Sequence, residues 1–227
     1  MVSPQVPLHP AQVEAAQAIY NSAHAGSWRR TDGALAALCS AMPDVNPAAT
    51  LLKVVTVNSL YGTNVYAVDR AALHVADVLN GAEGLLRCRP ELVEKMAAIP
   101  PPPAGGATRM HRSFASKFAH FFIDHDCFPI YDSFALKMLR AHLGRDALAA
   151  DPTPTYMAFE AAFRTLAQKA GLGSDTRRLD RYLWMIGQYR DWTRNPSAQI
   201  NSELRDLFQA DPPELAVAAG AWYHPRA

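Results

Sequence analysis

The chain has 227 residues, of which 49% are apolar, so it can bury a hydrophobic core and does not have the composition of a disordered protein. Charged residues make up 19% of the sequence and the formal net charge is +1, which excludes a chain that is basic throughout. A nucleic-acid-binding function would therefore require positive charge that is concentrated on one face.

The cysteines and the N-terminal residues indicate the cellular compartment. Cys39, Cys88 and Cys127 are far apart and odd in number, which fits a reducing compartment and lacks the clustered spacing of a zinc or iron–sulfur site. No apolar run approaches the roughly 18 residues of a membrane-spanning helix, and residues 1–10 lack a signal-peptide pattern. We therefore expect a cytoplasmic protein with no membrane partner and no cofactor.

Helix signals dominate the first half of the chain. Pro10 and an alanine-rich run predict a helix over residues 11–23, and Thr31-Asp32 can cap a second over residues 33–42. Asn46-Pro47 is a strong helix start, and the apolar run after it predicts a buried central helix. Its β-branched stretch KVVTVN would also suit a strand, but no hairpin partner lies nearby.

Residues 100–106 form a proline-then-glycine linker, which marks the best boundary between an N-terminal part and the remainder of the chain. Helix signals continue after this linker. Four phenylalanines recur at helical steps and predict a buried amphipathic helix over residues 113–123. We predict further helices over residues 64–79, 91–98, 134–139, 153–171, 176–192 (capped by Ser174 or Asp175), 201–208 and 213–219. The sequence therefore predicts an all-α protein of about ten helices with no convincing strand.

Two charged residues are notable in this pattern. Lys117 lies among Phe114, Phe118 and Phe121 near the start of its helix, where a charge is costly unless it has a role. Asp132 follows the break at Cys127-Phe128-Pro129. The simpler interpretation is that Lys117 extends its amine to solvent and that Asp132 caps the next helix.

Three motifs in this order resemble those of the helix-hairpin-helix DNA glycosylases. The run Ser113-Phe-Ala-Ser-Lys117-Phe-Ala is similar to the Gly-x-Gly-x-Lys-x-Ala half of the family's hairpin, with Ser113 and Ala115 in place of the glycines. The run Phe128-Pro-Ile-Tyr-Asp132-Ser resembles the family's segment that carries the catalytic aspartate. The run Leu60-Tyr-Gly-Thr-Asn64-Val resembles the turn at the DNA-facing end of the central helix, with Tyr61 in place of a base-probing glutamine.

The resemblance implies a two-lobed helical architecture with the active site between the lobes. The approximate lobes are residues 46–144 and residues 1–45 with 145–227, which together form a single glycosylase-like unit. It also implies a monomeric DNA glycosylase of the lysine-bearing, bifunctional type, acting on double-stranded DNA with a modified base. The modified base is either an oxidised purine, in DNA repair, or a hypermodified or glucosylated cytosine of phage DNA, in phage defence.

Asp132 and Lys117 have the side-chain chemistry that the steps of base excision require. Breaking the N-glycosidic bond gives an oxocarbenium-like sugar, which the Asp132 carboxylate would stabilise. Lys117 would attack the sugar C1′ and form a Schiff base that leads to strand cleavage. It must be neutral to do so, and the apolar surroundings would lower its pKa.

The remaining site residues concern DNA. The helix start near Ser113 would bind a phosphate through its backbone N–H groups. The predicted DNA-binding residues are Arg109, His111, Arg112, Ser113, Ser116, Tyr61 and Asn64. The predicted base pocket consists of Asn58, Trp184 and Gln188. Arg177, Arg178 and Arg181 form a second basic patch, although such arginines usually lie on a solvated face.

Two alternatives belong to other functional classes. The first is a non-catalytic helical DNA-binding module in which only the basic patches matter. The second is a metal-dependent hydrolase, because His120, Asp124, His125 and Cys127 carry side chains that bind metals and His120 and Asp124 are one helical turn apart.

Overall fold

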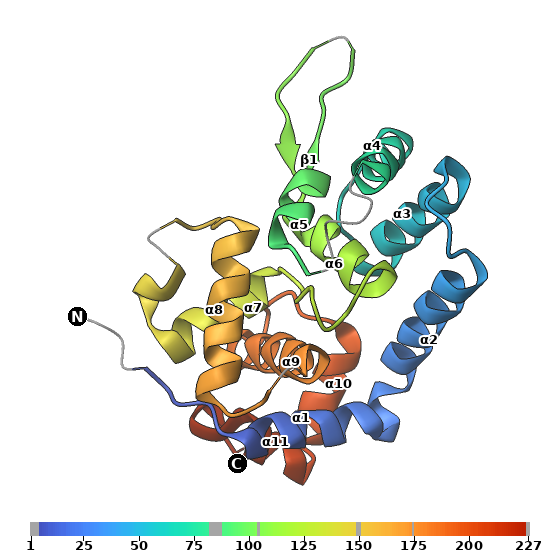
Figure 1. Cartoon of the computed structure of the whole chain (residues 1–227). Coiled ribbons are helices and arrows are strands. Elements are labelled where there is room, and N and C mark those ends of the chain that lie inside the picture. Colours follow the sequence, from blue (N-terminus) through green and yellow to red (C-terminus); the bar gives the residue numbers. More distant parts are fainter. Residues whose placement is uncertain (1–4, 82–87, 104, 149–150, 174, 226–227) are drawn as a thin grey trace. The chain divides into compact units, whose positions relative to one another are not determined.

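The computed structural model describes residues 5–81, 88–103, 105–148, 151–173 and 175–225, and helices dominate these residues (Figure 1). The described part of the chain contains eleven α-helices and one two-stranded sheet, so the all-α prediction is confirmed. The helices are α1 (Pro10–Asn21), α2 (Gly26–Ala41), α3 (Pro47–Tyr61), α4 (Val68–Asn80), α5 (Pro90–Ala97), α6 (Arg112–Phe122), α7 (Ser133–Leu143), α8 (Tyr156–Lys169), α9 (Thr176–Arg194), α10 (Ser202–Ala210) and α11 (Pro213–Ala219).

The chain divides into two compact units. Unit 1 comprises Met1–Arg30, Asp132–Pro154 and Ala161–Ala227, and unit 2 comprises Thr31–Tyr131 and Thr155–Glu160. Three short 3-10 helices, η1 (Ala23–Ala25), η2 (Arg145–Leu148) and η3 (Gly220–Trp222), belong to unit 1. Within the described residues, no helix combines the length and apolar character that crossing a membrane requires.

The predicted central helix of unit 2 is confirmed as α3. The Asn46 side chain accepts a hydrogen bond from the backbone N–H of Ala49 at 2.9 Å, and Pro47 occupies the first helical turn. Val54 and Val57 are fully buried, and α3 packs on α4 and α6. The helix is terminated by Gly62, whose φ of 54° is left-handed. Burial between neighbouring helices therefore overrides the strand propensity of the β-branched run.

Two predictions about the organisation of the chain were wrong. Helix α2 begins at Gly26 instead of after Thr31-Asp32, because the Arg29 guanidinium donates hydrogen bonds to the carbonyls of Tyr20 and Ser22 and holds the earlier turn in place. Residues 100–106 do not separate two parts of the chain. They lie inside unit 2, between strands β1 (Ala98–Ile99) and β2 (Arg109–Met110), which pair antiparallel; Ala104 lies outside the described residues.

The other helix predictions agree with the structure apart from their ends. Asp132 caps α7 by accepting a hydrogen bond from the Ala135 backbone N–H at 2.7 Å. Asp175 caps α9 through the Arg178 backbone N–H at 3.2 Å, and Ser174 lies outside the described residues. Helix α11 has the predicted bounds.

The core of unit 1 contains a buried hydrogen-bonded chain. The Val6 carbonyl accepts a hydrogen bond from His142 Nδ1 at 2.7 Å, and the Tyr182 hydroxyl lies 3.2 Å from His142 Nε2. Gln12 donates to both the Tyr182 hydroxyl and the Ala218 carbonyl. Burial is the main cause that lowers the pKa of His142 to about 4, with Arg190 acting in the same direction and the Val6 carbonyl opposing it. The chain links α1, α7, α9 and α11.

We expect unit 1 to lose stability as the pH falls from about 6.5 to about 4. In this range the unfolded chain takes up a proton at His142 that the folded protein resists, so protonation favours unfolding; the loss should approach 3 kcal/mol at the low end. All four tryptophans, Trp28, Trp184, Trp192 and Trp222, lie in unit 1, so urea denaturation followed by tryptophan fluorescence reports on this unit. A His142→Gln variant should show a flatter dependence on pH, and an unchanged slope would contradict the assignment.

Candidate functional site

Lys117 is buried on α6, with 7% of its surface exposed. Its Nζ donates a hydrogen bond to Ser113 Oγ at 2.8 Å and lies 5.9 Å from the ring centroid of Tyr61. Phe114 and Phe118, on the same helix, are also buried. The helix therefore places the amine next to a hydroxyl group and near the Tyr61 ring, two neighbours that the sequence did not predict.

Three further polar side chains share a face of α6 with Lys117. Ser113, Ser116 and His120 are spaced by three or four residues along the helix, which places them on one side of it. Ser116 is fully buried; its hydroxyl accepts from the Tyr131 backbone N–H at 2.9 Å and donates to the Ser113 carbonyl. His120 Nδ1 lies 2.9 Å from the Phe128 carbonyl oxygen. This face fastens residues 128–131 to α6.

The predicted basic residues before α6 differ in their contacts. Arg109 is exposed on β2, and its charge together with burial lowers the pKa of His111, burial being the larger cause. Arg112 forms an ion pair with Glu94 at 2.8 Å. Glu94 also accepts a hydrogen bond from the Tyr156 backbone N–H. Arg112 therefore has a structural partner in unit 2, while Arg109 presents its charge at the surface.

The turn after α3 is held by Asn58. Its Oδ1 accepts from the Val65 backbone N–H at 2.9 Å and from the Thr63 hydroxyl at 2.8 Å, and its Nδ2 donates to the Val65 carbonyl. Asn64 has a left-handed φ of 57°. Tyr61 stacks on Phe121, with ring centroids 5.4 Å apart. Asn58 thus fixes the turn, and Tyr61 lies beside Lys117.

The other two predicted pocket residues lie on α9 in unit 1. Trp184 packs edge-on against Trp28, with ring centroids 5.2 Å apart. Gln188, one helical turn later, is 2% exposed, and its Oε1 accepts from the Asn201 backbone N–H at 2.8 Å. Gln188 Nε2 and Trp28 Nε1 are both buried without a hydrogen-bond partner among the described residues. Unit 1 therefore holds two unsatisfied donors around Trp184, whereas Asn58 belongs to unit 2 with Lys117.

A second buried lysine was not predicted from the sequence. Lys53 on α3 is 4% exposed, donates to the Asp44 carbonyl at 3.1 Å and lies 5.7 Å from the ring centroid of Phe122. Burial lowers the pKa of Lys53, and Cys39 and Asp44 oppose this shift. The available signal was a lysine at position 53 within the largely apolar stretch of residues 51–57. Unit 2 thus contains two buried lysines near aromatic rings, so a substitution of Lys53 can serve as the control for a substitution of Lys117.

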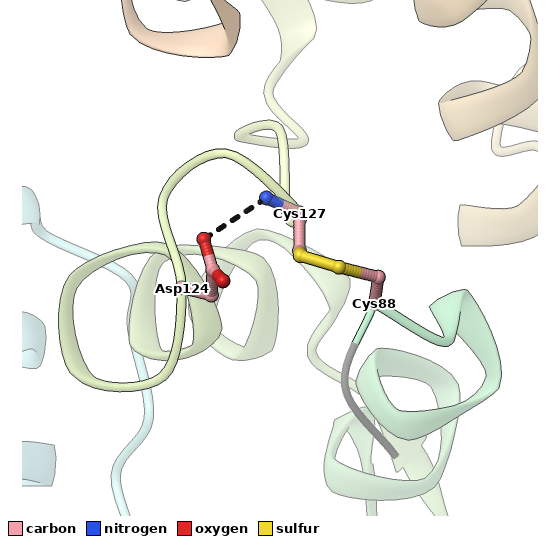
Figure 2. Close-up of side chains that lie close together, drawn as sticks. All are labelled: Cys88, Asp124 and Cys127. Atoms are coloured by element: carbon pink, nitrogen blue, oxygen red, sulfur yellow. Dashed lines mark hydrogen bonds between the residues drawn. A yellow bond between two sulfur atoms is a disulfide. The ribbon is translucent and has the colours of Figure 1, made fainter. Parts of the chain in front are cut away.

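The residues of the predicted metal cluster are brought together only in part. Asp124 and Cys127 meet Cys88, and the three ligand atoms lie within 4.8 Å of one another (Figure 2). Cys88 and Cys127 form a disulfide with Cα atoms 4.6 Å apart, so their sulfurs are not thiolates in this state. Asp124 accepts from the backbone N–H groups of Asp126 and Cys127.

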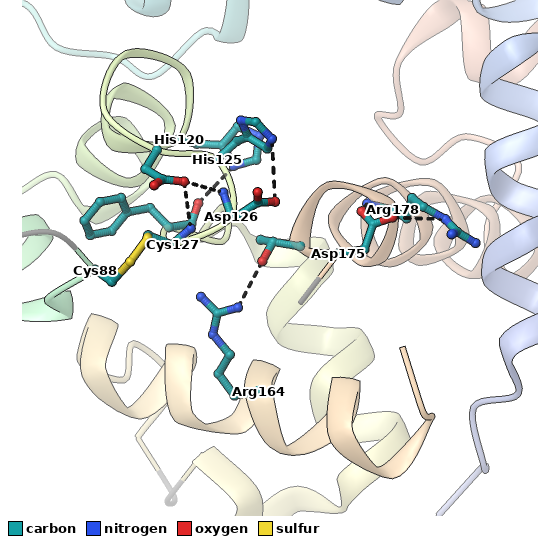
Figure 3. Close-up of polar contacts among 11 residues, drawn as sticks. Cys88, His120, His125, Asp126, Cys127, Arg164, Asp175 and Arg178 are labelled. Atoms are coloured by element: carbon teal, nitrogen blue, oxygen red, sulfur yellow. Dashed lines mark hydrogen bonds and ion pairs between the residues drawn. A yellow bond between two sulfur atoms is a disulfide. The ribbon is translucent and has the colours of Figure 1, made fainter. Parts of the chain in front are cut away.

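The two histidines of that cluster have other contacts. His120 lies against Phe128, and His125 pairs with Asp126 (Figure 3). The disulfide was not predicted, because its cysteines have a sequence separation of 39 and therefore give no local signal. The second basic patch is also engaged within unit 1. Arg178 contacts Asp175 (Figure 3) and Glu14, and Arg181 stacks on Tyr20.

These features describe an all-α protein of two compact units, one of which carries the buried lysine. Residues 12–126, just over half of the chain, match the family model HI_0787_N, which is described as an N-terminal domain. The chain therefore belongs to the HI_0787_N family. The matched region includes Lys53 and Lys117 and ends before Asp132. No curated protein and no solved structure matches the chain.

Reducing the disulfide should destabilise unit 2, because the bond restricts the unfolded chain; a loop closed across a sequence separation of 39 corresponds to about 4 kcal/mol. Mass spectrometry of the unreduced, digested protein should detect the peptide that joins Cys88 and Cys127. Thermal unfolding followed by circular dichroism should then give a lower melting temperature for Cys127→Ser than for Cys39→Ser, because Cys39 is a free cysteine. Recovery of both cysteines as thiols in the untreated protein would refute the pairing.

Proposed function

We propose that the protein is a DNA glycosylase with lyase activity that removes a modified base from double-stranded DNA, with Lys117 as nucleophile and Asp132 as its electrostatic partner. The observation that carries the proposal is the setting of Lys117, buried beside aromatic rings with its Nζ 2.8 Å from Ser113 Oγ. A buried amine is costly to keep without a function, and an amine nucleophile needs apolar surroundings of this kind.

The proposed reaction uses the lysine amine in two stages. The neutral Nζ attacks C1′ of the sugar while the N-glycosidic bond breaks, and the base leaves with that electron pair and gains a proton. Opening of the sugar ring then gives an imine between Nζ and C1′. Loss of a proton from C2′ expels the 3′ phosphate and cuts the strand. Asp132 would stabilise the positive charge that develops on the sugar as the base leaves.

The base would be recognised by donors in unit 1. The unsatisfied Nε2 of Gln188 and Nε1 of Trp28 both favour a ligand that offers hydrogen-bond acceptors. Base edges carry ring nitrogens and carbonyl oxygens of this kind, and Trp184 offers a face for stacking. An oxidised purine and a glucosylated cytosine both carry such acceptors, so both remain candidates, for a role in repair or in phage defence.

A second candidate function is DNA binding without catalysis. It is favoured by Arg109, which is exposed on β2 shortly before α6, in a stretch, residues 109–117, without an acidic residue. The two functions differ in one outcome, because a binding module forms no covalent intermediate. Salt-dependent binding without any product would support the module.

Borohydride trapping on a duplex with an abasic site tests the lysine without knowledge of the base. We expect the wild type and Lys53→Met to form a covalent protein–DNA adduct and Lys117→Met to form none. Both variants remove a buried amine from unit 2 and keep a similar side-chain volume. An adduct in Lys117→Met would reject this residue as the nucleophile. No adduct in any of the three proteins would leave DNA binding as the better proposal.

Two substitutions of Asp132 separate its cap from its proposed chemistry. An asparagine side chain can still cap α7, so Asp132→Asn should keep the stability of unit 1, whereas Asp132→Ala should lose about 1 kcal/mol. Both variants should excise the base more slowly, on the order of 100-fold for a lost charge interaction. The measurements are tryptophan-monitored denaturation and release of base from DNA with an oxidised purine or glucosylated cytosine. Excision by Asp132→Asn at the wild-type rate would show that Asp132 only caps α7 and has no role in the reaction.

A further inference from the structure

Unit 1 contains a cavity of about 340 Å³ that is distinct from the proposed catalytic residues. Residues from α7, η2 and α9 line it. The charged side chains in the lining are Lys137, Arg140, Arg145, Arg190, Asp191 and Arg194. The cavity therefore presents an excess of four positive charges, in a chain whose formal net charge is only +1.

Helical spacing concentrates these charges on two facing surfaces. On α7, Lys137 and Arg140 are three residues apart, and on α9, Arg190 and Arg194 are four residues apart. The two helices pack directly on each other, and Gly187 on α9 lies against Phe134 on α7. The cationic side chains of both helices therefore border the same space.

The positive charges of this cavity are not balanced by acidic side chains among the residues that the structure describes. Asp191 is the single acidic residue of the lining and pairs with Lys137 at 2.5 Å. Arg140 donates to the Asp151 backbone carbonyl at 2.7 Å and forms no ion pair with a described residue. The side chains of Arg145 and Arg194 make no hydrogen bond or ion pair with any residue that the structure describes.

Arg190 is held rigidly in the wall of the cavity. Its guanidinium carbon lies 4.5 Å from the ring centroid of Trp222, and Nη1 contacts Met138 Sδ at 3.4 Å. Its Nε is buried without a hydrogen-bond partner among the described residues. Burial and the neighbouring Arg194 both lower the pKa of Arg190, with burial the larger cause. A bound anion would satisfy the donor and relieve this repulsion.

We propose that this cavity binds phosphate groups, with Arg145, Arg190 and Arg194 as the main ligands. The planar guanidinium matches two phosphate oxygens at once, and a fixed arginine loses little entropy on binding. Four uncompensated charges suit a diphosphate better than a single carboxylate, and the cavity is within the usual size range for small ligands. The phosphates belong either to a free diphosphate or nucleotide, or to the DNA backbone. The proposal does not depend on glycosylase activity.

Calorimetric titrations with pyrophosphate and with an unmodified DNA duplex test the proposal and separate the two sources. The test variant is Arg145→Gln/Arg194→Gln, which removes two charges that have no partner among the described residues. The matched control is Arg30→Gln/Lys169→Gln, which removes two exposed charges of unit 1 outside the cavity. Circular dichroism and tryptophan fluorescence establish that both variants are folded. A third variant, Arg190→Gln, tests the arginine in the wall and should weaken binding of the same probe.

Binding of pyrophosphate that weakens at least tenfold in the test variant and not in the control would support the cavity as a site for free phosphate compounds. Binding of the duplex but not of pyrophosphate would point to the DNA backbone as the source of the phosphates. In that case the number of counter-ions released on binding, taken from the salt dependence of the affinity, should fall by about two in the test variant and stay unchanged in the control. Equal effects in test and control variants, or no binding of either probe, would overturn the proposal.

Discussion

The hydrogen bond from the Tyr131 backbone N–H to the buried Ser116 hydroxyl connects the two segments on which unit 2 depends. It joins the middle of α6 to the end of the Phe128–Tyr131 stretch, and His120 repeats the connection through the Phe128 carbonyl. Both side chains lie on the face of α6 that carries Lys117. The hydrogen bonds that hold residues 128–131 therefore also position α6, the helix that carries Lys117. A polar face on a buried helix is costly, and here each group on it has a partner.

Buried or half-buried basic side chains recur in both units and are accommodated in a similar way. Lys53 lies over Phe122, Lys117 over Tyr61, and Arg190 over Trp222. The negative face of an aromatic ring attracts a cation without adding a second charge to be desolvated. Aromatic packing thus allows cations into the interior while leaving them able to interact with an incoming anion. A carboxylate in the same place would neutralise the charge and reduce that capacity.

Local signals predicted most of the helices, because caps and apolar periodicity act within a few residues. Asn46, Asp132 and Asp175 each cap the helix that the sequence predicts. The predictions failed where contacts between residues distant in the sequence determine the structure. Arg29 extends α2 by binding carbonyls at the end of α1, and β1 pairs with β2 across a turn. The Cys88–Cys127 pair and the convergence of arginines from α7 and α9 depend on tertiary packing. Lys117 was identifiable because a charge among phenylalanines is unusual in any helix.

The close approach of α7 and α9 at Gly187 sets the dimensions of the cationic cavity. A Cβ atom added at this glycine would lie 2.7 Å from Phe134 Cβ and 3.1 Å from the Phe134 carbonyl oxygen. A larger residue could be accommodated only by moving the helices apart, because backbone atoms form part of the obstruction. The separation between the arginines of the two helices is thus defined by backbone packing and not by flexible side chains. The absence of a side chain at Gly187 therefore determines how closely the helices that carry Arg140 and Arg190 approach each other.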